Sequence, residues 1–137
     1  MALRISTSIR NACLNAVTST IDGGSGVGTV EFYTGAVPGG FGSAPAGTKL
    51  ATCTFSFPSF GAAAAGTMTA ASITSDSNAD ASGTVGCFCV KDSAAAVVMD
   101  GSCTATGGGG QIEFDSTTIA SGATVAITSL TISQPQS

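Results

Sequence analysis

The sequence predicts a mainly β protein, an antiparallel β-sandwich or barrel with one N-terminal amphipathic α-helix. Apolar residues recur with a helical period only in residues 3–21. Further on, apolar and polar residues alternate in about seven short runs separated by turn residues, which is typical of antiparallel sheets. Because the only helix comes first, an alternating α/β fold is not expected. We expect one domain over 1–137, with the β-sandwich over 29–133 and a frayed tail over 134–137.

The helix is predicted from one apolar stripe with steps of three and four residues. The members of this stripe are Ile5, Ile9, Ala12, Cys13, Ala16, Val17 and Ile21. Asp22-Gly23-Gly24 is expected to end the helix, because glycine readily adopts the left-handed cap conformation. We expect the stripe to pack on the sheet of its own domain; docking on a neighbouring subunit is the alternative. The following stretch, Gly23–Gly28, has neither the preceding strand nor the lysine of a phosphate loop and is predicted to be a connector.

Strand-like alternation begins after this connector. Val30 and Phe32 alternate with polar neighbours in residues 29–33, which indicates a strand with one buried face. Residues 49–57 alternate in the same way, and Pro58 ends this run because proline has no N–H to donate to a sheet. The side chains expected on the buried face of the second run are Ala51, Cys53, Phe55 and Phe57.

A long loop rich in glycine and proline, GAVPGGFGSAPAG, connects these two strands over residues 35–47. Loops of this length in small domains are often functional or interfacial. We therefore predict that the loop contacts a partner. The candidate interface residues are Val37, Pro38, Phe41 and Pro45.

Residues 67–74 are predicted as a strand of small residues, followed by a polar loop over 75–83. In this loop Asp76, Asn78 and Asp80 have the opening spacing of a calcium-binding loop. However, the sixth position is alanine rather than glycine, and the twelfth is not glutamate. We therefore predict a solvated loop and no metal.

The stretch GTVGCFCVKDSAAAVVMDGSC, residues 83–103, predicts a β-hairpin. One face of its first strand carries Val85, Cys87 and Cys89. The other face carries Thr84, Gly86, Phe88 and Val90. Both faces are apolar or small, so this strand is expected to be covered on both sides. The turn is placed at residues 91–93 and the returning strand at 96–99, and Asp100-Gly101 is predicted to form a closing turn.

Two further strands are predicted near the C-terminal end. Residues 111–115 alternate Ile112 and Phe114 with polar residues. Residues 124–133 place two apolar residues on one side and then two on the other. This change of register predicts a β-bulge near Thr128-Ser129.

Composition limits the classes of partner. The chain has eight acidic and four basic residues, no histidine, no tryptophan and a formal net charge of −4. Phosphate-backbone binding needs clustered Lys and Arg, so nucleic-acid binding is disfavoured. No stretch approaches the ~20 apolar residues of a membrane span, and the first residues lack the apolar run of a signal peptide. A chain with low charge and high apolar content is expected to face protein over much of its surface.

The five cysteines allow two interpretations. Because their number is odd, at least one has no partner within the chain. They are either small buried hydrophobes in a reducing compartment, or intersubunit cross-links in an assembly that ends in an oxidising medium. Without histidine or a CxxC pair, a zinc site is not expected. The candidates for intersubunit disulfides are Cys13, Cys53, Cys87, Cys89 and Cys103.

The sequence predicts no catalytic site and no cofactor. The absence of histidine excludes Ser/His and Cys/His nucleophile pairs, and Lys49 and Lys91 lie in no recognisable motif. Glu113 and Asp115 share one strand face, but on an apparently polar row they are expected to be solvent-exposed. We therefore predict that the protein is not an enzyme.

Three segments together resemble a known family. They are LRISTSIRNACLNAV, DGGSGVGTVEFYTGAVP and KLATCTFSFPSFGAAAAGTMTAASITSDSNADASGTVGCFCVKDSAAAVVMDG. They resemble small virion proteins of tailed bacteriophages, in which a helix is followed by strand–TG–strand, a LATxTFxxPxFG segment and an ADASGTxGxFxVxD segment. The similarity covers roughly residues 3–132, and its motifs are made of small residues without a catalytic signature.

The resemblance implies a structural role in the virion after synthesis in the host cytoplasm. A capsid decoration, or cement, protein is the favoured role, with the loop over 35–47 and the helix as contact elements. The implied partners are the major capsid protein or other virion proteins, and further copies of this chain as a trimer or in numbers set by particle symmetry. The alternative is a neck, tail or fibre component, including a receptor- or carbohydrate-binding β-module. Sugar platforms usually present aromatic faces, and one tyrosine without tryptophan favours the first role.

Overall fold

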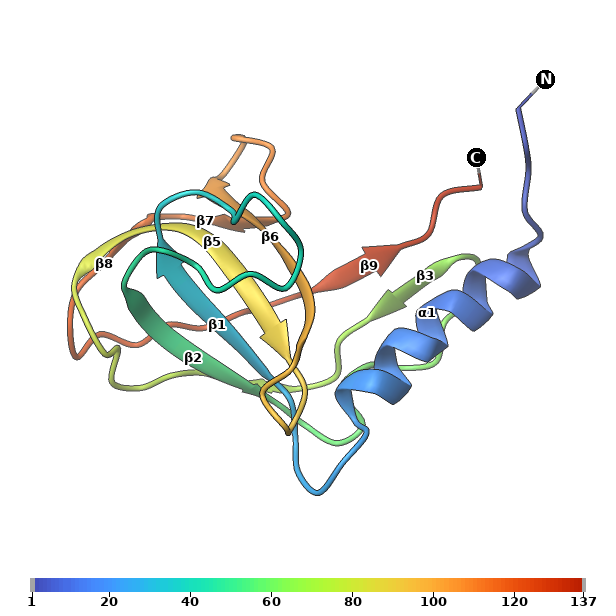
Figure 1. Cartoon of the computed structure of the whole chain (residues 1–137), viewed down its shortest axis with the longest axis horizontal. Helices are drawn as coiled ribbons and strands as arrows, with labels where there is room; N and C mark the ends of the chain where they lie inside the picture. Colours follow the sequence, from blue (N-terminus) through green and yellow to red (C-terminus); the bar gives the residue numbers. More distant parts are fainter. Residues whose placement is uncertain (1, 137) are drawn as a thin grey trace.

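The computed structural model describes residues 2–136 and confirms the predicted fold class (Figure 1). One sheet curls into a half-barrel, and a single helix lies beside a smaller two-stranded sheet at the other end of the molecule. The elements are α1 Thr7–Ile21, β1 Thr29–Thr34, β2 Lys49–Phe55, β3 Thr67–Thr69, β4 Ile73–Thr74, β5 Gly83–Lys91, β6 Val97–Ala105, β7 Ile112–Phe114, β8 Thr118–Ile119 and β9 Thr131–Ser133.

The large sheet has the order β4-β2-β1-β5-β6-β7, and β8 also pairs with β5. Its neighbours are antiparallel except β6 and β7, which are parallel. Val30 lies opposite Val90 and Phe32 opposite Phe88, and these side chains are buried together on the inner face of the sheet. Phe114 of β7 meets Phe32 edge to face, with 5.2 Å between ring centroids. The core therefore lies inside the curl of the sheet.

The helix begins four residues later than predicted, at Thr7 rather than residue 3. Ser6 is the N-cap, and its Oγ accepts a hydrogen bond from the Ile9 N–H at 3.3 Å. Because Ser6 has extended dihedral angles, residues 2–5 leave the helix as a short arm. The predicted end is confirmed, since Asp22 is the C-cap.

The predicted buried stripe of the helix is largely wrong. Leu14 and Ile21 are buried and Val17 is half-buried. The exposed members of the predicted stripe are Ile9, Ala12, Cys13 and Ala16. The helix is therefore rotated relative to the prediction.

Two asparagines explain this rotation. The side-chain oxygen of Asn11 accepts the Gly66 N–H at 2.8 Å, and that of Asn15 accepts the Ala63 N–H at 3.0 Å. In the segment before β3, these two backbone N–H groups need hydrogen-bond acceptors, and the two asparagine side chains supply them. A pattern of apolar residues alone does not reveal this polar requirement.

The central hairpin is confirmed, with one correction. β5 and β6 pair directly, and residues 85 and 87–90 of β5 are buried on both faces as predicted. Asp92 organises the turn, because its Oδ1 accepts the N–H groups of Ala94 and Ala96, both at 2.9 Å. Asp100-Gly101 is not a turn but lies within β6. A Cβ at Gly101 would lie 2.7 Å from the Phe88 ring, so glycine here permits close packing within a strand.

β2 ends two residues earlier than predicted. Three of the four predicted side chains are buried, but Phe57 is 72 % exposed because it lies beyond the strand. Leu50 is also buried, on the opposite face from the predicted set. Residues 80–83 lie against it, and the Asp80 N–H bonds to the Leu50 carbonyl at 2.7 Å.

The two predicted strands of small residues are each interrupted. The 67–74 run divides into β3, which pairs with β9, and β4, which pairs with β2. The 124–133 run becomes an isolated bridge between Val125 and Asp76, followed by irregular chain and then β9. The expected single strand with a bulge is therefore wrong.

The C-terminal segment is held where fraying was predicted. The Gln134 N–H donates to the Gly66 carbonyl at 2.9 Å, and its carbonyl accepts Arg10 Nε at 2.6 Å. The Gln136 carbonyl accepts the Ile5 N–H at 3.1 Å. These bonds join the end of the chain to α1 and its arm; Ser137 lies outside the described residues.

Candidate functional site

The structure buries four of the five candidate cysteines. Cys53, Cys87 and Cys89 have no exposed surface and Cys103 is 6 % exposed, whereas Cys13 on α1 is exposed. All five are free thiols. Burial raises the pKa of Cys103 to about 12, and it also raises the pKa of each of the three fully buried thiols.

A raised pKa suppresses the thiolate, which is the reactive form in disulfide exchange. A buried thiol also cannot reach a neighbouring subunit while this fold is intact. Of the five cysteines that were candidates for an intersubunit disulfide, only Cys13 is therefore accessible to a neighbouring subunit.

The candidate interface loop, residues 35–47, leaves β1 and returns to β2. Its ends are tied together, because Thr34 N–H donates to the Thr48 carbonyl at 3.0 Å and Thr48 N–H donates to Thr34 Oγ1 at 2.9 Å. Phe41 at its tip is 69 % exposed, and the other three candidates, Val37, Pro38 and Pro45, are half-buried. The loop passes in front of β5 and β6 (Figure 1). One large aromatic side chain is therefore presented to solvent from a loop closed at its base.

A second exposed apolar surface is the outer face of α1, which we define as Ile9, Ala12, Cys13 and Ala16. These residues are spaced at i, i+3, i+4 and i+7 and so share one side of the helix. All four are exposed, and Ile9 is 54 % exposed. This face carries no charged side chain, so it can contribute apolar area to a contact.

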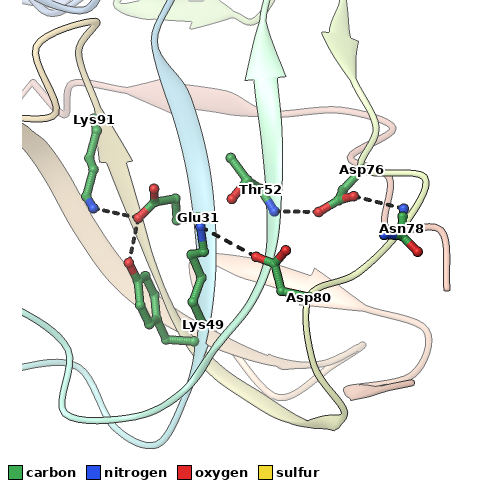
Figure 2. A network of polar contacts seen from close by, with 8 residues as sticks. Glu31, Lys49, Thr52, Asp76, Asn78, Asp80 and Lys91 are labelled. Carbon is green, nitrogen blue, oxygen red and sulfur yellow. Dashed lines mark hydrogen bonds and ion pairs between the residues drawn. The ribbon is translucent and has the colours of Figure 1, made fainter. Parts of the chain in front are cut away.

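The outer face of the sheet carries a row of polar contacts (Figure 2). Glu31 of β1 accepts the Tyr33 hydroxyl at 2.5 Å and pairs with Lys91 of β5 at 2.6 Å. Burial opposes the charge of Glu31, but the two partners outweigh burial and lower the pKa of Glu31. Burial and the neighbouring carboxylate raise the pKa of Tyr33 to about 12, and Glu31 raises the pKa of Lys91.

Each member of this trio therefore keeps its ordinary charge at neutral pH. A general acid or base works best when its pKa lies near the working pH. The shifts move the pKa values of Glu31, Tyr33 and Lys91 further from neutral pH. The ion pair between Glu31 and Lys91 instead links β1 to the neighbouring strand β5.

The residues of the partial calcium pattern bind protein groups. Asp76 accepts the N–H groups of Thr52 at 2.8 Å and Asn78 at 2.9 Å, and Asp80 pairs with Lys49 at 3.4 Å (Figure 2). In residues 2–136, no three or more His, Cys, Asp and Glu side chains form a group able to hold a metal ion. Asp76 acts as a clamp between β2 and the loop after β4.

Glu113 and Asp115 are both exposed. The Glu113 carboxylate accepts the N–H groups of Gly107 at 3.1 Å and Gly109 at 3.0 Å, which lowers the pKa of Glu113. The glycine-rich tip between β6 and β7 is thus held by Glu113 of β7.

One surface feature was not predicted from the sequence. A pocket of about 460 Å³ lies between β7 and the segment over residues 123–131. We call it the C-terminal pocket; its apolar lining is Ile112, Phe114, Ile119, Val125, Ile127 and Leu130. The change of register in residues 124–133 was the available signal, because it marks where this segment stops following a single strand.

Comparison of this chain with protein-family models, curated proteins and solved structures gave no match. Within residues 2–136, the helix is too short and too polar to cross a membrane.

Proposed function

We propose that this chain is a non-enzymatic structural protein of a bacteriophage virion, namely a capsid decoration protein that stabilises the particle through subunit contacts. The resemblance of its motifs to small virion proteins of tailed bacteriophages, over roughly residues 3–132, supports the virion assignment. The partners in this proposal are the major capsid protein and further copies of the chain.

The observation that carries the proposal is the outer face of α1. A solvated helix usually turns its apolar stripe inward, yet here the stripe over Ile9 and Cys13 faces outward while Asn11 and Asn15 face the domain. Burial of apolar surface is the main favourable contribution in most protein–protein association. A neighbouring subunit that covered this face would gain that contribution without rearranging the domain.

Phe41 adds a second contact from the loop over residues 35–47. Exposed aromatic side chains are common anchors of protein interfaces. Charged residues of either sign make up only 9 % of the chain, so contacts with partners would be mainly apolar. Cys13 in the outer face of α1 would form the intersubunit disulfide after particle release.

The test is cryo-electron microscopy of the particle that carries this chain, with the wild type and two variants. Density at regular positions on the capsid lattice, with α1 and Phe41 at the contacts, is the expected result. Ile9→Asp should reduce occupancy, because it places a charge in the contact. Ser8→Asp is the matched control, since Ser8 is exposed on the same helix but outside the outer face of α1.

Density confined to the neck, tail or fibres would replace decoration with a role in assembly or host contact. Absence of the chain from purified particles would overturn the virion assignment altogether. Non-reducing electrophoresis of particles tests the Cys13 disulfide separately. We expect a dimer band in the wild type that is absent in Cys13→Ser. A wild type that shows only monomer would contradict the proposed disulfide.

A further inference from the structure

Residues 126–129 form irregular chain, with a bend at Thr128 and no strand partner among residues 2–136. None of its four backbone N–H groups donates to a backbone carbonyl elsewhere in residues 2–136. The neighbouring residues are paired, since Val125 exchanges two hydrogen bonds with Asp76 and the Leu130 carbonyl accepts the Ala70 N–H at 2.8 Å. Its composition, Ala-Ile-Thr-Ser, includes β-branched residues that favour strands. Its unpaired backbone N–H groups are therefore available as donors to an added strand.

β7 offers an open edge on the opposite side of the C-terminal pocket. The Phe114 carbonyl points toward β6, because it accepts the Thr106 N–H at 3.0 Å. Since consecutive residues of a strand direct their backbone groups to opposite sides, the N–H and C=O of Glu113 point away from β6. β7 has no strand partner on that side among residues 2–136.

The unpaired segment and β7 lie at the two ends of the half-barrel. The large sheet ends at β7 on one side. On the other side it ends at β4, and the chain after β4 pairs through Asp76 with Val125. The pocket of about 460 Å³ fills the interval between them. One additional strand in this interval would close the barrel and pair on both sides.

We propose that the C-terminal pocket receives the arm of a second copy of this chain, residues 2–5, as an added β-strand. In the described chain this arm has a single backbone hydrogen bond, from Ile5 to Gln136, so little is lost on its release. Leu3 is 84 % exposed, the largest exposure among the large apolar residues. The arm has four residues, as many as the unpaired segment, and would span about 13 Å when extended.

The sequence of the arm fits the two faces of the pocket. In a strand, Leu3 and Ile5 would lie on one face and Arg4 on the other. The apolar pair would face the inner wall formed by Phe114 and Ile127. Arg4 would then lie on the outer side.

Charge supports the same occupant. The C-terminal pocket is lined by two carboxylates, Glu113 and Asp115, and by no lysine or arginine. Glu113 lies in β7 on the side opposite Ile112 and Phe114, and Asp115 follows at a bend directly after the strand. A strand beside β7 would place Arg4 next to them, and opposite charges across neighbouring strands attract.

The arm must come from another copy. It extends from α1 at the end of the molecule remote from β7 and β8 (Figure 1). Four residues cannot carry it around the domain. The inference concerns how copies of this chain join each other, and it holds whether or not the assembly is a virion.

Analytical ultracentrifugation of the full chain tests the proposal by charge exchange. The wild type should self-associate, and Arg4→Glu or Asp115→Arg alone should weaken association by about tenfold or more. Combining the two substitutions should restore most of the affinity, because the charge pair is re-formed with its partners exchanged. Lys49→Glu changes the net charge as much as Arg4→Glu but lies outside the arm and the pocket, and should leave association unchanged.

Cross-linking between two tagged copies gives an independent readout in a Cys13→Ser background. One copy carries Ala2→Cys and the other Thr128→Cys, so an intermolecular disulfide requires the arm of one in the pocket of the other. The control replaces Thr128→Cys with Ala94→Cys, an exposed position in the β5–β6 turn. A monomer up to about 1 mM overturns the proposal. So does association that the charge substitutions leave unchanged, or cross-linking no greater than in the control.

Discussion

The β5–β6 hairpin and the segment over residues 124–133 have similar patterns of alternation but different structures. Both alternate apolar and small residues. The hairpin pairs with itself through a short turn, and β5 is buried on both faces between β1 and β6. The C-terminal segment depends on partners far along the chain, Asp76 and β3, and between these two contacts the backbone of residues 126–129 makes no backbone hydrogen bond within residues 2–136. Alternation thus predicts which side chains face the core, but a strand also needs an available edge.

The largest loss of unfolding free energy is expected for substitutions in the core beneath the hairpin. Phe32→Ala should lower the free energy of unfolding by about 3–5 kcal/mol, because Phe32 is fully buried and packs on Phe114. Urea unfolding measures this change. Phe57→Ala is the control: Phe57 is 72 % exposed, so its change should stay within about 0.5 kcal/mol. Equal costs at the two positions would contradict the described position of the core.

Asp76 connects the two regions, so its removal should have the next largest effect. Asp76→Ala leaves the N–H groups of Thr52 and Asn78 without their acceptor and should cost about 1–3 kcal/mol in unfolding free energy. Asp80→Ala removes only an exposed ion pair with Lys49, worth about 0–1 kcal/mol. Hydrogen exchange should show faster opening near Val125 in Asp76→Ala. A loss no larger than that in Asp80→Ala would argue against the clamp.

Tyr33 provides a pH test of the trio that ties β1 to β5. It is the only tyrosine, so ultraviolet absorbance of tyrosinate reports its ionisation alone. The folded protein should titrate with a Tyr33 pKa of about 12, against the ordinary value of 10.0, and Glu31→Gln should lower that midpoint. A midpoint near 10 in the wild type would contradict the buried contact.

The sign of the linked stability follows from these shifts. The folded pKa of Tyr33 is raised, so its contribution is fully present below pH 10.0 and is lost as pH rises toward about 12. Lys91 acts in the same direction from 10.5 upward, because its pKa is also raised. The lowered pKa of Glu31 acts at the opposite end: its contribution is present above 4.5 and is lost as pH falls through the folded value.

The smallest effect is expected in the open part of the C-terminal segment. Ile127→Ala should cost about 1 kcal/mol or less in unfolding free energy of the monomer, because Ile127 is half-buried beside a pocket rather than enclosed. Urea unfolding at low protein concentration isolates the monomer. A cost as large as that of Phe32→Ala would show that this segment is packed as tightly as the hairpin.

The sequence predicted features that depend on local pattern. The alternation of Val30 and Phe32, the two covered faces of β5 and the end of α1 at Ile21 are all confirmed. The orientation of α1 was not predictable from its apolar residues, since Asn11 and Asn15 turn toward backbone donors of a segment about fifty residues away. For the same reason, the apolar surface left over Ile9 and Cys13 emerged only from the structure.

The candidate site was predicted in part. Phe41 is exposed on its loop as an interface residue would be, and Cys13 is the one accessible thiol of five. Cys53, Cys87 and Cys89 were placed correctly on strands, whereas Cys103 was placed beyond the predicted closing turn and in fact lies in β6. The distance of each thiol from the surface depends on how many layers cover its strand. Periodicity gives the face of a residue and not its depth.

The sequence alone determined that the chain is mainly β, that the helix comes first, and where β1 and β2 start, because these follow from spacing and turn chemistry between neighbours. The tertiary structure decided which way α1 faces, which edges of the half-barrel stay open and where the C-terminal pocket lies. Those features depend on hydrogen-bond donors and edges brought together from distant parts of the chain, and no local pattern encodes a partner that is far away.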